Sequence, residues 1–350
     1  MQKVTVHASR NYEILIGSGL LSTLGEETAR CVHGKKVCLV SDSNVYPLHG
    51  PVAEESLKKA GFHVISYVFP AGEESKNGEN YLSLLNFLAR NQLTRADCLI
   101  ALGGGVTGDL TGFAAATYLR GIAFIQVPTT LLAAVDSSVG GKTAIDLPAG
   151  KNLAGAFYQP NLVLCDTDTL QTLPREIFLD GCAEVIKYGI LYDKPFFEYL
   201  QAAGPEFDRE RVIRRCVELK RDVVAEDEFD TGERMKLNLG HTVGHGVEAK
   251  SHFAVSHGKA VAIGTAIVSR AAAQGGMLSR LDADTIVDTL QAFGLPTVTA
   301  YTAEELVHYM LSDKKRAGGT VNLIVPRTIG RCDIVPTPVE QLDAFVQSGL

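Results

Sequence analysis

The sequence lacks several features, and each absence excludes a class of protein. It has no Trp, and its aromatic content of 7% says little about the class of protein. Its seven cysteines are scattered singly, with no CxxC pair. This pattern argues against a disulfide scaffold and favours a reduced cytoplasmic compartment. No apolar run approaches the ~18 residues of a membrane span, and no apolar stretch typical of a signal peptide follows the opening MQKVTVHASR.

Charge and length narrow the classes further. The chain has 33 Lys and Arg against 40 Asp and Glu, a formal net charge of −7, whereas a general nucleic-acid binder is basic. Its 350 residues, 46% of them hydrophobic, suffice for two domains that fold without disulfides or a structural metal. We therefore expect two soluble domains, with no nucleic-acid or membrane partner.

The first half of the chain alternates short apolar runs with helical patterns. The runs are almost continuous in Val, Ile and Leu, which is typical of parallel strands buried on both faces. They lie at Lys36–Val40, His63–Phe69, Asp97–Leu102, Ala123–Val127 and Asn161–Cys165, and Val4–Ile16 is expected to form an opening hairpin or edge strand. Leucines near helical spacing in Tyr81–Asn91 predict a helix, so strand–helix–strand units predict a doubly wound parallel sheet.

The second half has a different pattern, because β-branched runs become rare and Gly or Pro punctuates long helical segments. The predicted helices are Glu176–Ile190, Glu206–Glu228, Leu237–Lys250, Lys259–Gln274, Asp282–Phe293 and Ala303–Ser312, and Val321–Val325 predicts a short strand. We expect an α/β domain and a mostly helical domain with a boundary near residue 172. A cleft between two such domains is the usual place for a ligand.

A glycine cluster follows the predicted strand that ends at Leu102. The string GGGVTGD at Gly103–Asp109 fits GxGxxG, in which backbone N–H groups closely approach a pyrophosphate. The acidic residue expected about 20 positions later is missing, and the motif does not lie in the first βα turn. We interpret the cluster as a nucleotide site outside the usual Rossmann fingerprint, with a plain tight turn as the alternative.

A second glycine-rich string, GGKT at 140–143, matches only part of a P-loop. The full GxxxxGK[ST] pattern needs glycine at position 136, where Asp136 would repel the phosphates. Lys142 is instead expected in a glycine-rich loop, either meeting an anionic ligand or solvated at the surface.

Four of the nine histidines lie between positions 241 and 257, and three of them, His241, His245 and His257, are candidate metal ligands. His241 and His245 stand at i and i+4 on one helix face, a spacing typical of metal ligands, and Thr242 excludes the HExxH protease motif. His257 opens the next helix, and Glu184 is a polar residue in an apolar stretch. A catalytic metal takes about three protein ligands, so we predict a metal site, with structural histidines as the alternative. Spacing alone selects the pair His241 and His245.

Scattered cations complete the set of candidate residues. Each alone is typical of a solvated surface, but several lie beside glycine or motif residues, which would suit an anionic, phosphorylated substrate. They are Arg120, Lys151, Lys187, Lys220, Arg234, Lys314 and Lys315.

Several longer strings strongly resemble the 3-dehydroquinate synthases of the sugar phosphate cyclase superfamily. The strings are GGGVTGDLTGFAAATYLRGI (103–122), QVPTTLLAAVDSSVGGKTAID (126–146), GKNLAGAFYQP (150–160), GCAEVIKYGI (181–190), and LNLGHTVGHGVEA with SHGKAVAIG (237–264). The similarity covers nearly the whole chain, in the same order. It implies an N-terminal Rossmann-like NAD-binding α/β domain (1–172), a C-terminal mostly α-helical metal- and substrate-binding domain (173–350), and a homodimer.

The resemblance also implies a reaction, the second step of the shikimate pathway. In it 3-deoxy-D-arabino-heptulosonate 7-phosphate becomes 3-dehydroquinate and phosphate. NAD transiently oxidises a ring hydroxyl that a metal polarises, phosphate leaves by β-elimination, hydride returns, and the opened ring closes by an intramolecular aldol step. The departing phosphate is expected to take the proton itself, and holding the right conformer is expected to be a main contribution of the enzyme.

The resemblance assigns roles residue by residue. Divalent zinc or cobalt would be held by Glu184, His241 and His257, with His245 beside the substrate rather than on the metal. NAD would contact Asp42, Glu73, Lys76, Gly105, Val106, Thr107, Gly108, Asp109, Thr129, Thr130, Lys142, Lys151, Thr169, Leu170, Gln171 and Thr172. Substrate or catalytic contacts would come from Arg120, Asp136, Lys142, Lys187, Lys220, Arg234, Asn238, His245 and one or both of Lys314 and Lys315.

Three other readings compete with this one. They are a metal- and NAD-dependent polyol dehydrogenase, a sibling sugar phosphate cyclase, and a catalytically silent ligand-binding descendant. One departure from the family is visible at Lys259, where many relatives have Glu. It predicts either an effect on metal affinity or, more simply, a solvated lysine at the start of a helix.

Overall fold

The computed structural model describes residues 1–312 and 319–350, which divide into two units. The first unit holds Met1–Pro174 and Arg209–Phe229, and the second holds Arg175–Asp208 and Asp230–Leu350. The predicted division near residue 172 differs from these units in one element, helix α7 (Arg209–Glu226). This helix packs on strands β1 and β2, so a segment from the second half of the sequence joins the N-terminal core.

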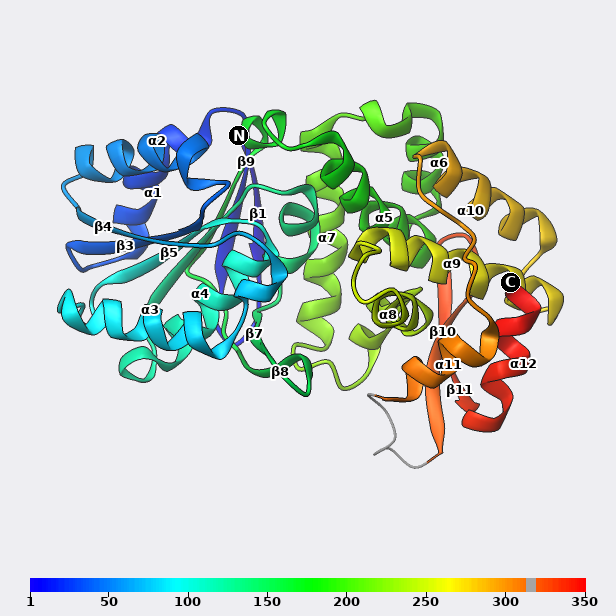
Figure 1. The fold of residues 1–350 in the computed structure, drawn as a ribbon. Helices are drawn as coiled ribbons and strands as arrows, with labels where there is room; N and C mark the ends of the chain where they lie inside the picture. Colours follow the sequence, from blue (N-terminus) through cyan, green and yellow to red (C-terminus); the bar gives the residue numbers. More distant parts are fainter. Residues whose placement is uncertain (313–318) are drawn as a thin grey trace. The chain divides into compact units, whose positions relative to one another are not determined.

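A seven-stranded sheet forms the centre of the first unit (Figure 1), in the order β1-β2-β9-β6-β5-β3-β4. Its strands are β1 (Gln2–Val6), β2 (Tyr12–Gly17), β3 (Lys36–Asp42), β4 (His63–Phe69), β5 (Cys98–Gly103), β6 (Ala123–Pro128) and β9 (Leu162–Asp166). Strands β1 and β2 pair as an antiparallel hairpin, and the other neighbours pair in parallel. The predicted strands and the parallel sheet are confirmed.

Helices cover both faces of this sheet, which explains why the sequences of the strands are continuous apolar runs. The helices are α1 (Leu24–Cys31), α2 (Tyr46–Lys59), α3 (Gly78–Arg90) and α4 (Gly105–Thr117). Val37 and Leu39 of β3 belong to the core that includes α1 and α2, and the alternate residues Cys38 and Val40 belong to the core that includes α3 and α4. Successive side chains of a strand point to opposite faces, so two apolar cores require apolar residues at every position.

The strand order reverses between β3 and β5. From β3 the chain first adds β4 at the edge of the sheet, and it then returns to add β5, β6 and β9 on the other side of β3. Doubly wound sheets bind ligands in the crevice at such a reversal, beyond the carboxyl ends of the strands. Asp42 and Gly103 end the two strands that flank this point.

A second, two-stranded sheet of the first unit corrects the expected position of Lys142. Strands β7 (Lys142–Leu147) and β8 (Gly150–Phe157) pair antiparallel, and Lys142 is the first residue of β7, paired with Phe157. The glycine-rich turn ends just before it, because Gly140 and Gly141 have the positive φ angles of 93° and 69°. The Gly- and Ala-rich sequence of β8 has little of the branched pattern that identifies strands.

The second unit is mostly helical, as predicted. Its elements are α5 (Arg175–Tyr192), α6 (Lys194–Ala203), α8 (His241–Lys250), α9 (His257–Gln274), α10 (Arg280–Ala292), α11 (Ala303–Ser312), α12 (Val339–Gly349), and the antiparallel strands β10 (Thr320–Thr328) and β11 (Arg331–Pro338). The sequence did not predict α6, β11 and α12. The helix expected over Leu237–Lys250 begins only at His241, because Gly240 adopts a left-handed conformation with φ of 77° after the short helix η7 (Glu233–Asn238).

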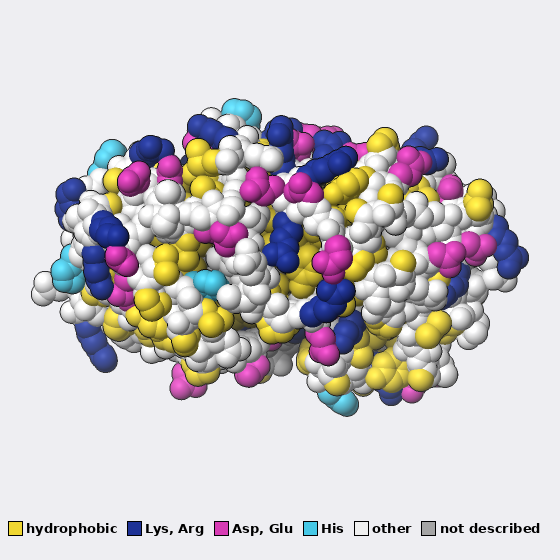
Figure 2. Space-filling view, turned by 90° about the horizontal axis from the view of Figure 1, so that it is seen from above, with side chains coloured by type: hydrophobic (Ala, Val, Ile, Leu, Met, Phe, Trp, Pro, Cys, Tyr) yellow, Lys and Arg dark blue, Asp and Glu magenta, His cyan; other side chains and the backbone are white. Residues whose placement is uncertain are grey.

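The surface shows both signs of charge. On the face drawn in Figure 2, Lys and Arg side chains are interspersed with Asp and Glu side chains. Within the described residues, no helix is both long enough and apolar enough to cross a membrane.

Candidate active site

The predicted cofactor residues of the first unit share one edge of the main sheet. Most of them end a parallel strand or follow its carboxyl end: Asp42 on β3, Glu73 and Lys76 after β4, Gly105–Asp109 after β5, Thr129 and Thr130 after β6, and Thr169–Thr172 after β9. Lys142 and Lys151 instead lie on β7 and β8. Parallel strands bring their carboxyl ends to one edge, so the topology gathers residues that lie far apart in the sequence.

Asp42 and Thr107 connect the two strands at the reversal. The buried Asp42 carboxylate accepts hydrogen bonds from the backbone N–H groups of Asn44 (2.9 Å) and Val45 (3.0 Å). Its second oxygen accepts one from the Thr107 hydroxyl at 3.3 Å. These contacts hold the turn after β3 against the start of α4.

The glycine cluster is a crowded turn that ends in a helix N-terminus. A Cβ added at Gly103 would lie 2.4 Å from the Thr107 hydroxyl oxygen, and one at Gly104 would lie 3.1 Å from the Thr130 side chain. Gly104 precedes the first residue of α4, where unpaired backbone N–H groups favour an anion. The two interpretations of GGGVTGD, a nucleotide site and a plain tight turn, therefore fit the same geometry. The turn is tight, and it also presents backbone N–H groups.

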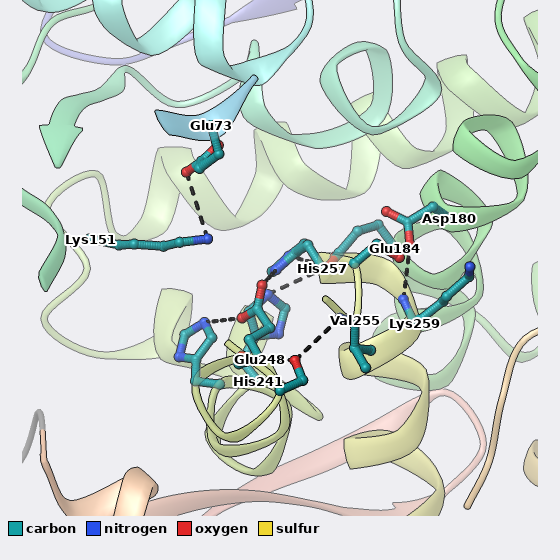
Figure 3. A network of polar contacts seen from close by, with 12 residues as sticks. Glu73, Lys151, Asp180, Glu184, His241, Glu248, Val255, His257 and Lys259 are labelled. Carbon is teal, nitrogen blue, oxygen red and sulfur yellow. Dashed lines mark hydrogen bonds and ion pairs between the residues drawn. The ribbon is translucent and has the colours of Figure 1, made fainter. Parts of the chain in front are cut away.

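A buried lysine holds three carboxylates near this edge. Lys76 Nζ lies 2.9 Å from Glu73, 3.3 Å from Asp109 and 3.9 Å from Asp146, and its side chain is only 5% exposed. Lys151 Nζ lies 3.8 Å from Glu73 (Figure 3). Asp146 is a member of this group that sequence reasoning missed, since nothing in its local pattern points to a lysine 70 positions earlier. Burial raises the pKa of Asp109 to about 6, and the Lys76 ammonium limits the rise.

We expect Asp109→Asn to change how stability depends on pH. Because the folded-state pKa of about 6 exceeds the usual 3.8, the folded chain binds more protons than the unfolded chain between these values. The wild type should therefore lose stability relative to Asp109→Asn as pH rises from about 4 to 6, by about 1–3 kcal/mol. Urea unfolding of both proteins at pH 4.5 and 7.5 measures this difference. A pH-independent offset between the two proteins would contradict the assignment.

The remaining predicted residues of the first unit lie on short helical turns and on α7. Lys220 Nζ, from α7, donates to the Asp136 carbonyl (2.6 Å) and carboxylate (2.8 Å) on the turn η4 (Ala133–Ser137). Arg120 ends the turn η3 (Tyr118–Arg120) with a left-handed φ of 67°, a conformation that costs energy for a residue with a Cβ.

In the second unit, two histidines and a carboxylate converge on one point (Figure 3). Nε2 of His241 and Nε2 of His257 each lie 3.4 Å from the same oxygen, Oε1 of Glu184, whose side chain is fully buried on α5. The ligand atoms of these three residues lie within 4.8 Å of one another. The buried Lys187, one turn further along α5, pairs with the other Glu184 oxygen.

Close helix packing places these side chains. A Cβ on Gly264 of α9 would lie 2.0 Å from the carbonyl oxygen of Gly240, directly before α8. The contact leaves no room for any side chain, so the N-terminal end of α8 approaches the middle of α9 closely. At the start of α9, the Asp180 carboxylate accepts the backbone N–H of Lys259 at 3.0 Å. In Figure 3 the Lys259 side chain points away from the imidazoles.

The cluster has the donors that a divalent transition metal requires. Burial lowers the pKa of His241 to about 3, so its imidazole is neutral. Burial also opposes protonation of His257, but the carboxylates of Glu184 and Glu248 outweigh it and raise its pKa to about 10. The two carboxylates therefore favour positive charge at this point, which suits a metal cation. Two imidazole nitrogens and one carboxylate oxygen are a ligand set typical of catalytic zinc and are also suited to cobalt.

The other predicted residues of the second unit have different positions. His245 lies on the same face of α8, but its side chain is 54% exposed, and its Nε2 lies 4.0 Å from Glu248 rather than beside Glu184. The spacing-based pair of His241 and His245 is therefore not the pair that meets at Glu184. Arg234, which is 1% exposed, and Asn238 both lie on η7. Lys314 and Lys315 lie outside the described residues.

Comparison with known sequences gives one family. The sequence models of the 3-dehydroquinate synthase N-terminal and C-terminal regions match residues 66–180 and 181–316. The chain is 46% identical to a 3-dehydroquinate synthase of Caulobacter vibrioides over 92% of its length and 91% of the relative. It is 45% identical to that of Pelobacter propionicus, and the match covers 98% of both chains.

Comparison with solved structures gives the same fold. A 2-deoxy-scyllo-inosose synthase, solved with carbaglucose-6-phosphate, NAD+ and Co2+, is 25% identical with a TM-score of 0.90, and the match covers 100% of both chains. An iron-containing alcohol dehydrogenase matches at a TM-score of 0.70 with 16% identity, over 99% of both chains. The second match shows only a shared fold.

Proposed function

The chain belongs to the 3-dehydroquinate synthase family, and from this membership we propose how its residues divide the work of the family's reaction. It is an enzyme that converts 3-deoxy-D-arabino-heptulosonate 7-phosphate to 3-dehydroquinate and phosphate. The observation that carries this function is identity of 40–46% with 3-dehydroquinate synthases over nearly the whole chain. The dehydrogenase alternative rests on 16% identity, which supports the fold alone.

The enzyme uses NAD and one divalent metal, which we propose is zinc or cobalt. Support comes from the sugar phosphate cyclase solved with NAD+ and Co2+, and from the two imidazoles and one carboxylate that converge in this chain. When bound, these groups supply a hydride acceptor and a Lewis acid for a substrate hydroxyl. Glu184, His241 and His257 would hold the metal.

The residues around the metal ligands would orient the substrate. His245, exposed next to the ligand cluster, is positioned to hydrogen-bond a substrate hydroxyl or water and to move a proton at its ring nitrogen. Lys187 is buried against Glu184, so its ammonium adds positive charge for an anionic substrate group. Arg234 offers a planar guanidinium, which suits a carboxylate or phosphate, and Asn238 offers an amide on the same turn.

In the first unit, we propose that the carboxyl edge of the sheet binds NAD. The N–H groups at the start of α4 would face the pyrophosphate. Asp42, together with Lys76 and the carboxylates around it, would flank the pyrophosphate, and Lys151 would add positive charge. Thr129, Thr130 and Thr169–Thr172 lie at the same edge. Lys142, Arg120 and the Lys220–Asp136 pair are assigned to the phosphorylated substrate, whose conformer they would fix.

Three further assignments extend the proposal. We assign residues 1–172, together with the packed helix α7, to NAD binding and the rest of 173–350 to metal and substrate binding. All seven cysteines are free thiols, which supports a cytoplasmic location. Family membership supports a homodimer.

One assay tests the function. The protein is incubated with the heptulosonate phosphate, catalytic NAD and zinc, and inorganic phosphate and NADH are both measured. We expect phosphate release without net NADH, because the hydride returns to the substrate within each turnover. A chelator should stop the release, and added zinc or cobalt should restore it.

Two outcomes would contradict the proposal. Accumulating NADH would indicate a dehydrogenase, in which hydride leaves with the cofactor. If neither phosphate nor NADH were formed, the result would indicate a ligand-binding descendant without this activity.

A further inference from the structure

His257 is held at both of its ring nitrogens. Nε2 faces Glu184 at 3.4 Å, and Nδ1 lies 3.4 Å from Oε1 of Glu248, so the imidazole sits between carboxylates from α5 and α8 (Figure 3). Glu248 is a buried carboxylate with 7% of its side chain exposed. Such a group is costly to bury unless a partner compensates it, and His257 supplies a partner.

We propose that Glu248 is a positioning residue for the metal, acting through His257. Its carboxylate accepts the Nδ1–H of His257, which fixes the tautomer whose Nε2 lone pair points to Glu184 and His241. Metal-binding histidines usually donate their second N–H to a carboxylate or carbonyl in this way, and the contact orients the ring and makes the ligand more basic. The inference deepens the proposed function, since it concerns the metal site on which that function depends.

His241 provides an independent parallel. Its Nδ1 lies 3.1 Å from the carbonyl oxygen of Leu239, which leaves its Nε2 facing the same Glu184 oxygen. Both histidines thus have an oxygen acceptor at Nδ1 and direct Nε2 to one point. The two acceptors differ in charge, because His241 has a neutral carbonyl and His257 has a carboxylate. The carboxylate should therefore contribute more to the basicity of its ligand.

The arrangement follows from helical spacing. His241, His245 and Glu248 stand at i, i+4 and i+7 on α8, which places all three on one face. His257 opens α9, and the close packing of α8 and α9 brings its ring over this face. The spacing at 248 is the sequence signal that would have identified Glu248 beside the histidine pair.

The same contacts allow one alternative, in which Glu248 binds a metal directly. His245, Glu248 and His257 also form a group whose ligand atoms lie within 4.8 Å of one another. Two observations favour the positioning role. The Nε2 atoms of His241 and His257 converge on Glu184, and His245 is more than half exposed and lies 4.0 Å from Glu248.

Metal binding by Glu248→Gln tests the proposal. The full chain is stripped of metal, and zinc affinity is measured by competition with a chromophoric chelator, beside the visible spectrum of the Co2+-loaded protein. We expect one zinc per chain, bound about 10- to 100-fold more weakly than in the wild type. The Co2+ spectrum at saturation should keep the wild-type intensity, because the number and type of ligands do not change.

Controls separate this role from folding and from function. Glu305→Gln removes a carboxylate that also contacts α8, through Lys250 at 3.0 Å, and it should leave zinc affinity unchanged. Thermal unfolding of each metal-free variant shows whether the fold is intact, and Glu248→Asp provides a second variant that keeps the charge if Glu248→Gln does not fold.

Two results would overturn the inference. Wild-type zinc affinity in folded Glu248→Gln would show that the contact does not support the metal. A Co2+ spectrum that changes as it does in His257→Ala would show that Glu248 is itself a ligand. Neither result depends on turnover, so failure of the phosphate-release assay in a wild-type chain that binds zinc would overturn the proposed function and leave this inference standing.

Discussion

His257→Ala should lose most of its bound zinc, whereas His245→Ala should keep it. The reason is geometric, because Nε2 of His257 shares the buried Glu184 oxygen with His241, while His245 stands outside that group. Structural zinc sites with four ligands bind with about 10–16 kcal/mol, or about 2.5–4 kcal/mol for each ligand. Removing one ligand should therefore weaken zinc binding about 100- to 1,000-fold.

The experiment compares the two variants under identical conditions. Each protein is dialysed against a buffer of fixed free zinc, and bound metal is measured by elemental analysis alongside phosphate release. His257→Ala should lose metal and turnover together, and excess zinc should restore part of both. His245→Ala should retain metal but release phosphate slowly, since its imidazole is assigned to the substrate. Full zinc occupancy in His257→Ala would refute the ligand set.

The difference between these two histidines shows what sequence reasoning could reach. Spacing placed His241 and His245 on one face of a helix, because residues at i and i+4 share a face whatever surrounds them. It could not choose between His245 and His257, because that choice depends on how α5, α8 and α9 pack. The sequence offered Glu184 and His257 as candidates, but only the resemblance to a family selected them as ligands in place of His245. These two residues lie 73 positions apart in the sequence but 3.4 Å apart in the structure.

For the fold as well, the sequence predicts local features better than the packing of distant segments. The strands of the main sheet were predictable because burial on both faces demands unbroken apolar runs, as in Val37, Cys38, Leu39 and Val40. The position of α7 was not predictable, because the sequence pattern of an amphipathic helix is the same whichever core the helix covers. Strand β8 was missed for another reason: it is mostly exposed and rich in Gly and Ala, so neither burial nor propensity marks it.

The position of α7 matters for a second prediction, in which Lys220→Met lowers both the free energy of unfolding and the rate of phosphate release. The Lys220 side chain is 6% exposed, and its ammonium lies 2.8 Å from the Asp136 carboxylate, which is 24% exposed. Removing one partner of such a pair takes away a close compensating charge from a largely enclosed carboxylate, which costs about 3 kcal/mol. The lost hydrogen bond to the Asp136 carbonyl adds to this cost. Phosphate release should also fall sharply, because both side chains are assigned to the substrate.

A neighbouring position provides the matched control. Arg221 pairs with Asp222 at 2.7 Å, but the two side chains are 32% and 63% exposed, so solvent screens the pair and Arg221→Met should cost less than about 1 kcal/mol. Urea unfolding measures both variants in the same buffer. Equal losses in the two would contradict the argument, because they would show that burial of the Lys220 pair makes no difference.

The double variant Lys220→Met/Asp136→Asn separates stability from catalysis. Asp136→Asn removes the carboxylate charge that Lys220 offsets in the wild type, so the double variant should recover part of the free energy of unfolding that Lys220→Met loses. Its phosphate release should stay low, since neither charge remains to hold the substrate. If activity returned together with stability, the pair would serve only to attach α7 to η4, and the assignment of Lys220 and Asp136 to the substrate would be wrong.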